Sequence, residues 1–168
     1  AMPTLARPDS VLGSRRATLL GASLLTAVVL SPAVFLTGRV SPGVLALAVG
    51  GTHGASLLVV WIGTGYVTGR LQTYLSRRPR FLIGMASSAW LVLGALAAVP
   101  TYLLARWSLL APFVVLVPVT WLLTISFLLV DGETDVVDLY TFYGPLVVAA
   151  LVLLGSVEFV LRHGLATW

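Results

Sequence analysis

Two titratable side chains, His53 and Glu158, lie inside long apolar stretches of the sequence and are its best candidates for chemistry. An ionisable residue at membrane depth is energetically costly and is therefore a functional-site hypothesis. Imidazole titrates near neutral pH, and a histidine beside a carboxylate can relay protons or bind a cation. We therefore expect His53 and Glu158 to form an intramembrane polar site if their helices adjoin.

Each of these residues also has a structural interpretation. Arg162 follows Glu158 by four residues, a spacing that pairs the two side chains on one helix face. His53, as a neutral imidazole, can bond to a neighbouring helix. At a rise of about 1.5 Å per residue, His53 falls within about 3 Å of the membrane midplane, and Glu158 lies roughly 9 Å from it, toward the outside. A contact between them requires that the second and fifth apolar stretches lie side by side.

Other reactive chemistry finds little support in the sequence. It has no cysteine, which excludes thiolate metal sites and thiol nucleophiles, and it has no lysine, which excludes a Schiff base. Ser56 lies three residues after His53, but no third group orients the pair for nucleophilic catalysis. The depths of His163 and His53 differ by about 13 Å, too much for both to ligate one haem iron within a chain. The sequence therefore favours a protein that is not an enzyme, with no catalytic residue and no metal site, and it leaves open a haem or lipid bound between chains.

The segment between the fourth and fifth apolar stretches is acidic. Asp131, Glu133 and Asp135 stand at alternate positions, as ligands of a divalent cation can. The segment lacks the glycine and the distal glutamate of an EF-hand loop. We expect instead that Asp138 or Thr141 caps the fifth helix and that the acids pair with neighbouring arginines.

The elements that must position these residues follow from composition. Of 168 residues, 58% are hydrophobic and only 10% are charged, and the mean hydropathy is +1.02. Soluble domains carry about 25% charged residues. These values indicate an all-α integral membrane protein whose residues 1–168 form a single transmembrane helical domain.

Five stretches reach the roughly 20 apolar residues that a membrane helix needs. The fourth also contains Pro112 and Pro118, which predict an irregular helix. The expected spans are 17–37, 44–68, 81–105, 107–130 and 142–161.

Arginines predict the orientation of the bundle, because cytoplasmic loops carry an excess of basic residues. One side of the membrane has seven arginines: Arg7, Arg15, Arg16, Arg70, Arg77, Arg78 and Arg80. The other side has three: Arg39, Arg106 and Arg162. We expect a multi-pass cell-membrane protein with a cytoplasmic N-terminus and an external C-terminus. The cytoplasmic group Arg70, Arg77, Arg78 and Arg80 is also expected to contact anionic lipids. These flanking arginines account for the net charge of +4, so no nucleic-acid partner is expected.

The second span is rich in small residues at helical spacing. These are Ala46, Gly50, Gly54, Gly65 and Gly69. Small residues let helix backbones approach closely in lipid, which favours a position at the bundle centre or at an oligomer interface. The alternative is that the glycines leave room beside His53 for a ligand or an ion path.

Three function classes remain. The first is a non-catalytic subunit or accessory factor of a larger membrane complex of the respiratory or transport type. The second is a small oligomeric channel or transporter with His53 and Glu158 on the ion, proton or substrate path. The third is a membrane-embedded lipid or cofactor binder, or an enzyme. The expected partners are the lipid bilayer and either other membrane subunits or further copies of the chain.

Overall fold

The computed structural model describes residues 10–72, 79–129 and 136–164, and within them the chain forms a bundle of five long helices. Each helix is long and apolar enough to cross a membrane. The β-structure in these described ranges is a single isolated bridge between Ser10 and Leu129. The helices are α1 (Arg15–Phe35), α2 (Pro42–Val67), α4 (Pro79–Trp107), α5 (Ala111–Leu128) and α6 (Val136–Gly164).

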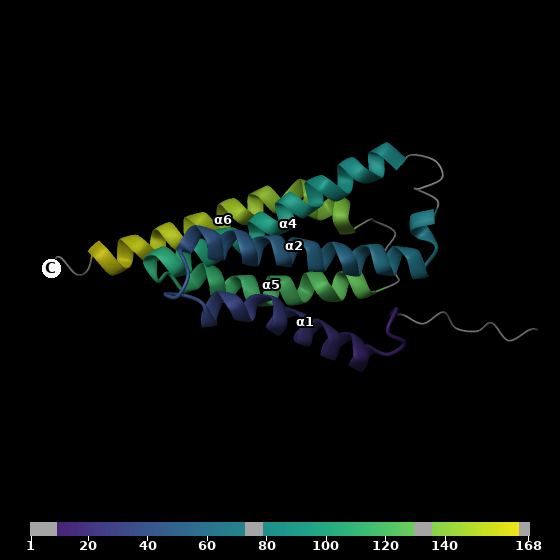
Figure 1. Ribbon diagram of the computed structural model, residues 1–168, viewed down its shortest axis with the longest axis horizontal. Coiled ribbons are helices and arrows are strands. Elements are labelled where there is room, and N and C mark those ends of the chain that lie inside the picture. The colour runs from purple at the N-terminus through teal and green to yellow at the C-terminus, as the bar shows by residue number, and fades with distance from the viewer. Residues whose placement is uncertain (1–9, 73–78, 130–135, 165–168) are drawn as a thin grey trace, which may run out of the picture.

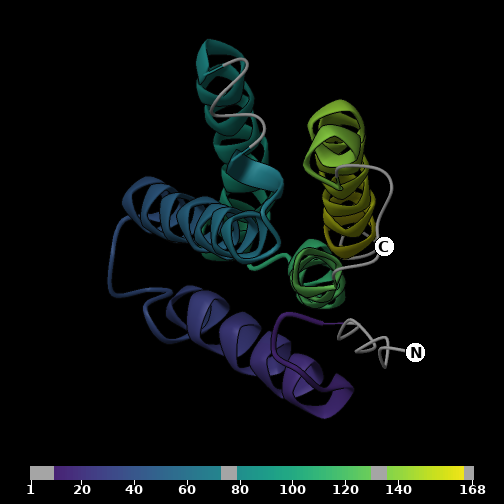
Figure 2. The same cartoon turned by 90° about the vertical axis from the view of Figure 1, so that its right-hand side faces the viewer.

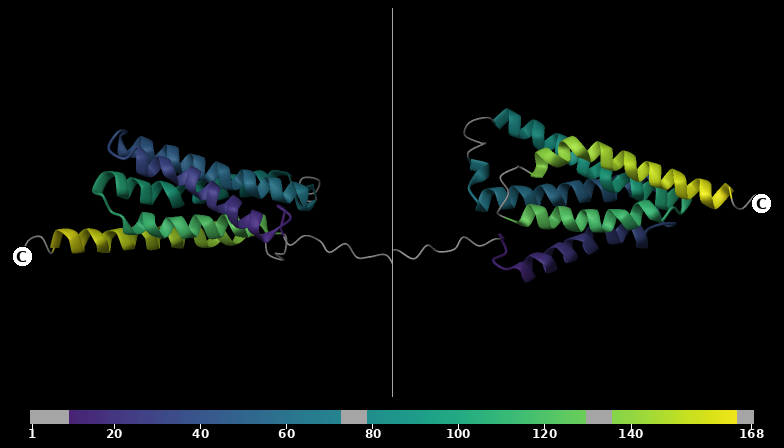
Figure 3. Two further views of the ribbon diagram at one scale, coloured as in Figure 1. Left: turned by 90° about the horizontal axis from the view of Figure 1, so that it is seen from below. Right: turned by 180° about the vertical axis from the view of Figure 1, so that it is seen from behind.

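Successive helices run in opposite directions along one long axis (Figure 1). Seen along that axis, α2 and α5 lie between α1 on one side and α4 and α6 on the other (Figure 2). Helix α1 crosses its neighbours at an angle, and α6 extends past them at the C-terminal end (Figure 3). Helix α5 packs against each of the other four helices, and the most extensive contact is between α2 and α4.

The boundary between the third and fourth spans differs from the prediction. Helix α4 continues to Trp107, and the chain then turns at Ser108, whose φ of 56° lies in the left-handed region. Helix α5 begins at Ala111, so Pro112 occupies a position where an amide hydrogen is not needed within the helix. Helix α5 is one continuous helical segment with Pro118 inside it.

The fifth span begins earlier than predicted. Helix α6 starts at Val136, so Asp138 and Thr141 lie inside it, and the prediction that either residue caps it is wrong. The Thr141 hydroxyl instead donates to the carbonyl of Val137 over 2.8 Å, within the helix. The early start extends α6 into what sequence alone assigned to the acidic loop. The remaining acidic residues of that loop, Asp131, Glu133 and Asp135, lie outside the described residues, as do Arg7, Arg77 and Arg78.

The contact between α2 and α4 is close because glycines face one another across it. A Cβ atom built at Gly50 would lie 2.7 Å from both the Gly94 carbonyl oxygen and the Ala98 Cβ. A Cβ atom at Gly54 would lie 2.8 Å from the Trp90 carbonyl oxygen. Both distances are shorter than van der Waals contact, so the two backbones can meet this closely only with glycine at these positions.

The other small residues of α2 have different surroundings. Ala46 is buried one turn before Gly50, on the same helix face. A Cβ atom built at Gly65 would lie 3.5 Å from the Leu71 Cβ, in the chain that follows α2. Gly69 lies beyond the end of the helix, and its φ of 76° lets the chain turn there. Ala46, Gly50 and Gly54 thus form the packing face, whereas Gly65 faces the chain beyond the helix and Gly69 belongs to the turn.

Replacing Gly50 with alanine should destabilise the protein. The added methyl group would clash with Gly94 and Ala98, and overpacking of this kind costs about 1–3 kcal/mol. Gly63→Ala is the matched control, because it makes the same change in the same helix with no atom within 4 Å of the new Cβ. Thermal unfolding in detergent should show a lower Tm for Gly50→Ala and an equal or higher Tm for Gly63→Ala. Equal Tm values for the two variants would contradict the close contact.

Candidate functional site

His53 connects three helices and is fully buried. Its Nδ1 lies 2.8 Å from the carbonyl oxygen of Leu93 in α4, and its Nε2 lies 3.0 Å from the hydroxyl oxygen of Thr120 in α5. A carbonyl oxygen can only accept, so Nδ1 carries the proton and donates to Leu93. In the neutral ring Nε2 then accepts from the Thr120 hydroxyl. The imidazole therefore bridges α2, α4 and α5.

The polar groups around His53 are satisfied locally. The Thr124 hydroxyl donates to the Thr120 carbonyl over 2.9 Å, one turn along α5. A second hydrogen bond joins α4 to α2, because the Trp90 indole N–H donates to the Gly51 carbonyl over 3.4 Å. Both ring nitrogens of His53 already have partners, so binding a metal ion or a proton-relay water there would break one of these bonds.

Glu158 binds the start of another helix. Its two carboxylate oxygens accept from the backbone N–H groups of Leu110 (3.1 Å) and Ala111 (2.8 Å), at the N-terminus of α5. Those N–H groups have no acceptor within their own helix, and the positive end of the helix dipole favours a carboxylate there. The predicted ion pair with Arg162 is present as well, with 2.5 Å between nitrogen and oxygen. Glu158 therefore caps α5 from α6 while its charge is balanced by Arg162.

The structure does not bring His53 and Glu158 together. Their partners on α5, Thr120 and Ala111, are nine residues apart, which corresponds to about 14 Å along the helix axis. Helix α6 packs against α4 and α5, whereas α2 packs against α4, α1 and α5. A joint site requires that the second and fifth spans lie side by side. The principal helix contacts do not include one between α2 and α6, so this requirement is not met.

His163 lies near the end of α6 and is exposed. Its ring stacks on that of Phe159 with centroids 4.1 Å apart, and the Phe159 ring meets Trp107 edge to face at 6.1 Å. Trp107 in turn contacts Tyr102. Such a group of aromatic rings at a bundle end is typical of the boundary between lipid and water. Among the described residues, no three or more histidine, aspartate or glutamate side chains gather closely enough to hold a metal ion.

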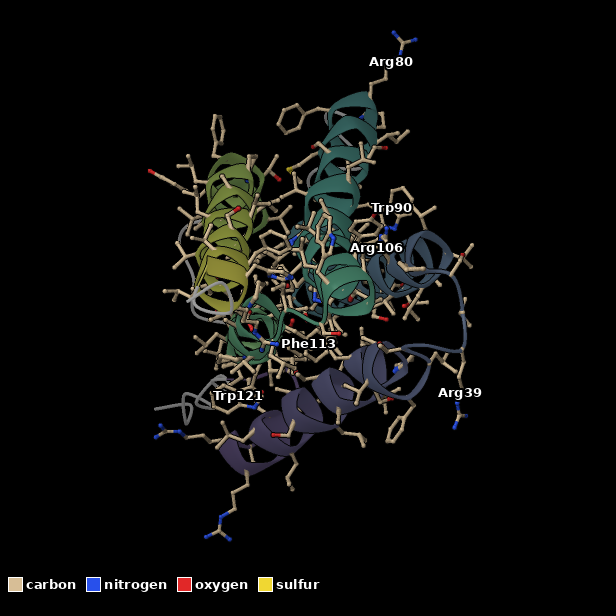
Figure 4. The ribbon with its side chains drawn as sticks, turned by 90° about the vertical axis from the view of Figure 1, so that its left-hand side faces the viewer. Arg39, Arg80, Trp90, Arg106, Phe113 and Trp121 are labelled. Atoms are coloured by element: carbon tan, nitrogen blue, oxygen red, sulfur yellow. The ribbon has the colours of Figure 1, made fainter. Side chains whose placement is uncertain are left out.

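Of the four arginines predicted to contact anionic lipids, the structure describes Arg70 and Arg80. Arg80 points away from the start of α4 (Figure 4), and Arg70 is exposed just after α2. These two positions lie at the same end of the bundle, because α2 and α4 run in opposite directions. That placement is compatible with contact between the arginines and lipid headgroups.

Sequence reasoning missed the partners of both titratable residues. The backbone groups that Glu158 caps lie 47 and 48 residues before it, and Leu93 and Thr120 lie 40 and 67 residues from His53. No local spacing encodes such pairs. Pro112 was the one available signal, since proline near the first turn marks the start of a helix that needs a cap.

Comparisons with known proteins give no further guide. No protein-family model, curated protein or solved structure matches this chain. The function must therefore be argued from what the polar groups contact and from the surfaces that the helices leave uncovered.

The bond between His53 and Thr120 should be measurable as a coupling energy. In a double-mutant cycle with His53→Leu and Thr120→Val, we expect a coupling of about 0.5–1.5 kcal/mol in the free energy of unfolding. Thr124→Val is the control, because the Thr124 hydroxyl binds a backbone carbonyl and not the imidazole. Its effect should add to that of His53→Leu. If the effects of His53→Leu and Thr120→Val on the free energy of unfolding also add, the bond between the two side chains contributes nothing to stability.

Removing the carboxylate of Glu158 should cost more than removing its ionic partner. Glu158→Leu leaves the N–H groups of Leu110 and Ala111 without their side-chain acceptor, and loss of a helix cap costs about 0.5–2 kcal/mol. Arg162→Leu removes an ion pair whose arginine side chain is 45% exposed, worth less than about 1 kcal/mol. Urea or thermal unfolding of the two variants in the same detergent gives the comparison. The reverse order of stability would show that the ion pair, and not the helix cap, is the main role of Glu158.

Proposed function

We propose that this chain is a non-catalytic subunit or accessory factor of a larger membrane assembly of the respiratory or transport type. The observation that carries the proposal is that the polar groups at membrane depth hold helices together. His53 links α2, α4 and α5, and Glu158 links α6 to α5. In a structural subunit, titratable groups can hold helices together in this way, whereas a transport path needs such groups free to bind the transported species.

The exposed face of α6 supports an assembly role. Only 17% of its membrane-crossing window is buried, compared with 33–39% for the other four helices. Its exposed side chains are large and apolar: Phe142, Leu146, Leu153, Val157 and Val160. In the bilayer such a face meets either lipid chains or another helix, and other membrane subunits are the partners we propose.

The proposed orientation places the N-terminus in the cytoplasm and the C-terminus outside the cell membrane. Arg15 and Arg16 at the start of α1 share one end of the bundle with Arg70 and Arg80. Positive residues concentrate on the cytoplasmic side of membrane proteins. The arginines at this end are also our proposed contacts for anionic lipid headgroups.

A small oligomeric channel or transporter is the alternative proposal. It would require several copies of the chain to enclose a polar path, and His53 would have to leave its bonds to Leu93 and Thr120 to join that path. The two proposals therefore differ in the composition of the particle, which can be measured directly.

We expect the protein, extracted from its native membrane in a mild detergent, to run as a particle that contains other membrane polypeptides. Native mass spectrometry gives the mass of the particle, and denaturing analysis gives its composition. A particle made only of this chain in several copies would favour the channel, and a single copy alone would contradict both proposals.

A matched pair of variants tests whether α6 carries the contact. Leu153 in α6 and Leu20 in α1 are both exposed leucines, at 66% and 72%. Leu153→Trp should reduce the recovery of the partner subunits, because the larger side chain disturbs helix packing at that face. Leu20→Trp should leave the assembly intact. Equal recovery with both variants would remove α6 as the docking face.

A further inference from the structure

A short segment before α1 connects that helix to the end of α5. The segment comprises residues 10–13 and is called the N-terminal strap. The Val11 N–H donates to the Leu128 carbonyl over 3.1 Å, and Ser10 forms an antiparallel bridge with Leu129. Figure 2 shows the strap between the start of α1 and the end of α5. The last carbonyls of a helix have no donor within that helix, so the strap supplies one for Leu128.

The strap is also attached to α1 itself. The Ser10 hydroxyl is hydrogen-bonded to the Thr18 hydroxyl near the start of that helix, and both residues are only 2% exposed. The chain reverses within the strap, because Gly13 has a φ of 75° and its N–H donates to the Ser10 carbonyl over 3.0 Å. This is the hydrogen bond of a β-turn from Ser10 to Gly13. The strap therefore joins α1 and α5 through bonds that are separate from the packing of the two helices.

The half of α1 next to the strap buries only small side chains. Its buried residues are Thr18, Ala22 and Thr26, whereas the larger Val29 and Leu30 are buried in the other half. Small side chains make few dispersion contacts, and lipid adds no hydrophobic force between helices. Packing therefore holds the far half of α1 more firmly than the half beside the strap.

Small residues strengthen the association of membrane helices when the backbones approach closely, and α1 and α5 do not do so along their length. A groove of about 460 Å³ lies between them, and α1 crosses its neighbours at an angle (Figure 3). Across this groove the Trp121 indole N–H donates to the Ser23 hydroxyl over 3.1 Å. The bonds of the strap are thus a large part of what holds the start of α1 in place.

The other end of α1 has the features of a pivot. Pro32 lies inside the helix and has no N–H to give to the Val28 carbonyl, which accepts instead from the Ser31 hydroxyl over 3.1 Å. Beyond the helix, Gly38 has a φ of 81° in the turn toward α2. A proline within a helix and a glycine in the left-handed region are positions where the chain can change direction.

We propose that the N-terminal strap is a latch for α1. While its bonds to Leu128 and Thr18 hold, α1 stays against α5. When they break, α1 swings away from α5 about residues 32–38, and the groove between the two helices widens. The strap thus controls how much of the α5 surface is open to the surrounding membrane. The inference concerns movement within one chain and does not depend on the proposed assembly role.

The movement can be measured on the full chain in lipid nanodiscs by pulsed electron paramagnetic resonance. The chain has no cysteine, so two introduced cysteines are the only sites for spin labels. Leu20 in α1 and Leu122 in α5 suit the labels, since these residues are 72% and 53% exposed. We expect one main distance between the two labels when the strap is unchanged.

Val11→Pro should release the latch. Proline has no N–H to donate to Leu128, but it suits the second position of a β-turn, so the turn itself can persist. We expect a second, longer distance between the labels, with the ratio of swung-out to held molecules raised about two- to tenfold by the loss of one hydrogen bond. Ser10→Ala together with Thr18→Val removes the bond to α1 and should act in the same direction. All three substitutions combined should give the largest share of the longer distance.

Two controls separate the release of α1 from a general loosening of the bundle. Labels at Leu47 in α2 and Leu91 in α4, which are 76% and 63% exposed, report on the contact between those helices. Their distance should stay the same in every strap variant. Thr52→Val is the matched control for Thr18→Val, because the Thr52 hydroxyl donates to carbonyls of its own helix. It should leave the distance between α1 and α5 unchanged.

Three results would overturn the proposal. One is an unchanged distance between positions 20 and 122 when all three strap substitutions are combined. Another is an equal lengthening between positions 47 and 91, because the bundle would then loosen as a whole. The third is a longer distance of the same size in Thr52→Val, which would make the effect independent of the strap.

Discussion

The close approach of α2 and α4 is the contact on which the rest of the bundle depends. Lipid supplies no hydrophobic force between helices, so their association rests on tight packing and hydrogen bonds. Gly50 and Gly54 lie against Gly94 and Trp90 with no room for a side chain. This proximity also brings the Leu93 carbonyl within reach of the His53 ring, which precedes Gly54 in the chain. The glycine contact and the histidine bridge are therefore parts of one arrangement.

Helix α5 extends that arrangement to the whole bundle, because it packs against each of the other four helices. It is held at two levels: Thr120 binds His53 in the middle of the span, and Glu158 binds the backbone at the start of the helix. Helix α6 is the least buried of the five described helices, with 17% of its membrane-crossing window buried against 33–39% in the others. The centre of the bundle is thus joined by polar contacts, while α6 offers an apolar face.

The sequence predicted the five apolar helices and the ion pair of Glu158 and Arg162, because hydropathy and a spacing of four residues are local signals. Some helix ends were misplaced because hydropathy does not locate a boundary inside an apolar stretch of sequence, such as the turn at Ser108 between α4 and α5. The partners of His53 could not be predicted, since they lie on two other helices whose register depends on glycine packing. Gly69 follows Gly65 by four residues, as on a helix face, but this spacing did not reveal that α2 ends before Gly69.

The cap that α6 provides for α5 has a consequence for how the chain enters the membrane. Until Glu158 arrives, the first N–H groups of α5 face either water or lipid, and lipid cannot accept their hydrogen bonds. The start of α5 is therefore complete only after the following helix has been synthesised and inserted. The two helices are expected to enter the bilayer as a hairpin, with the carboxylate of the second closing the first.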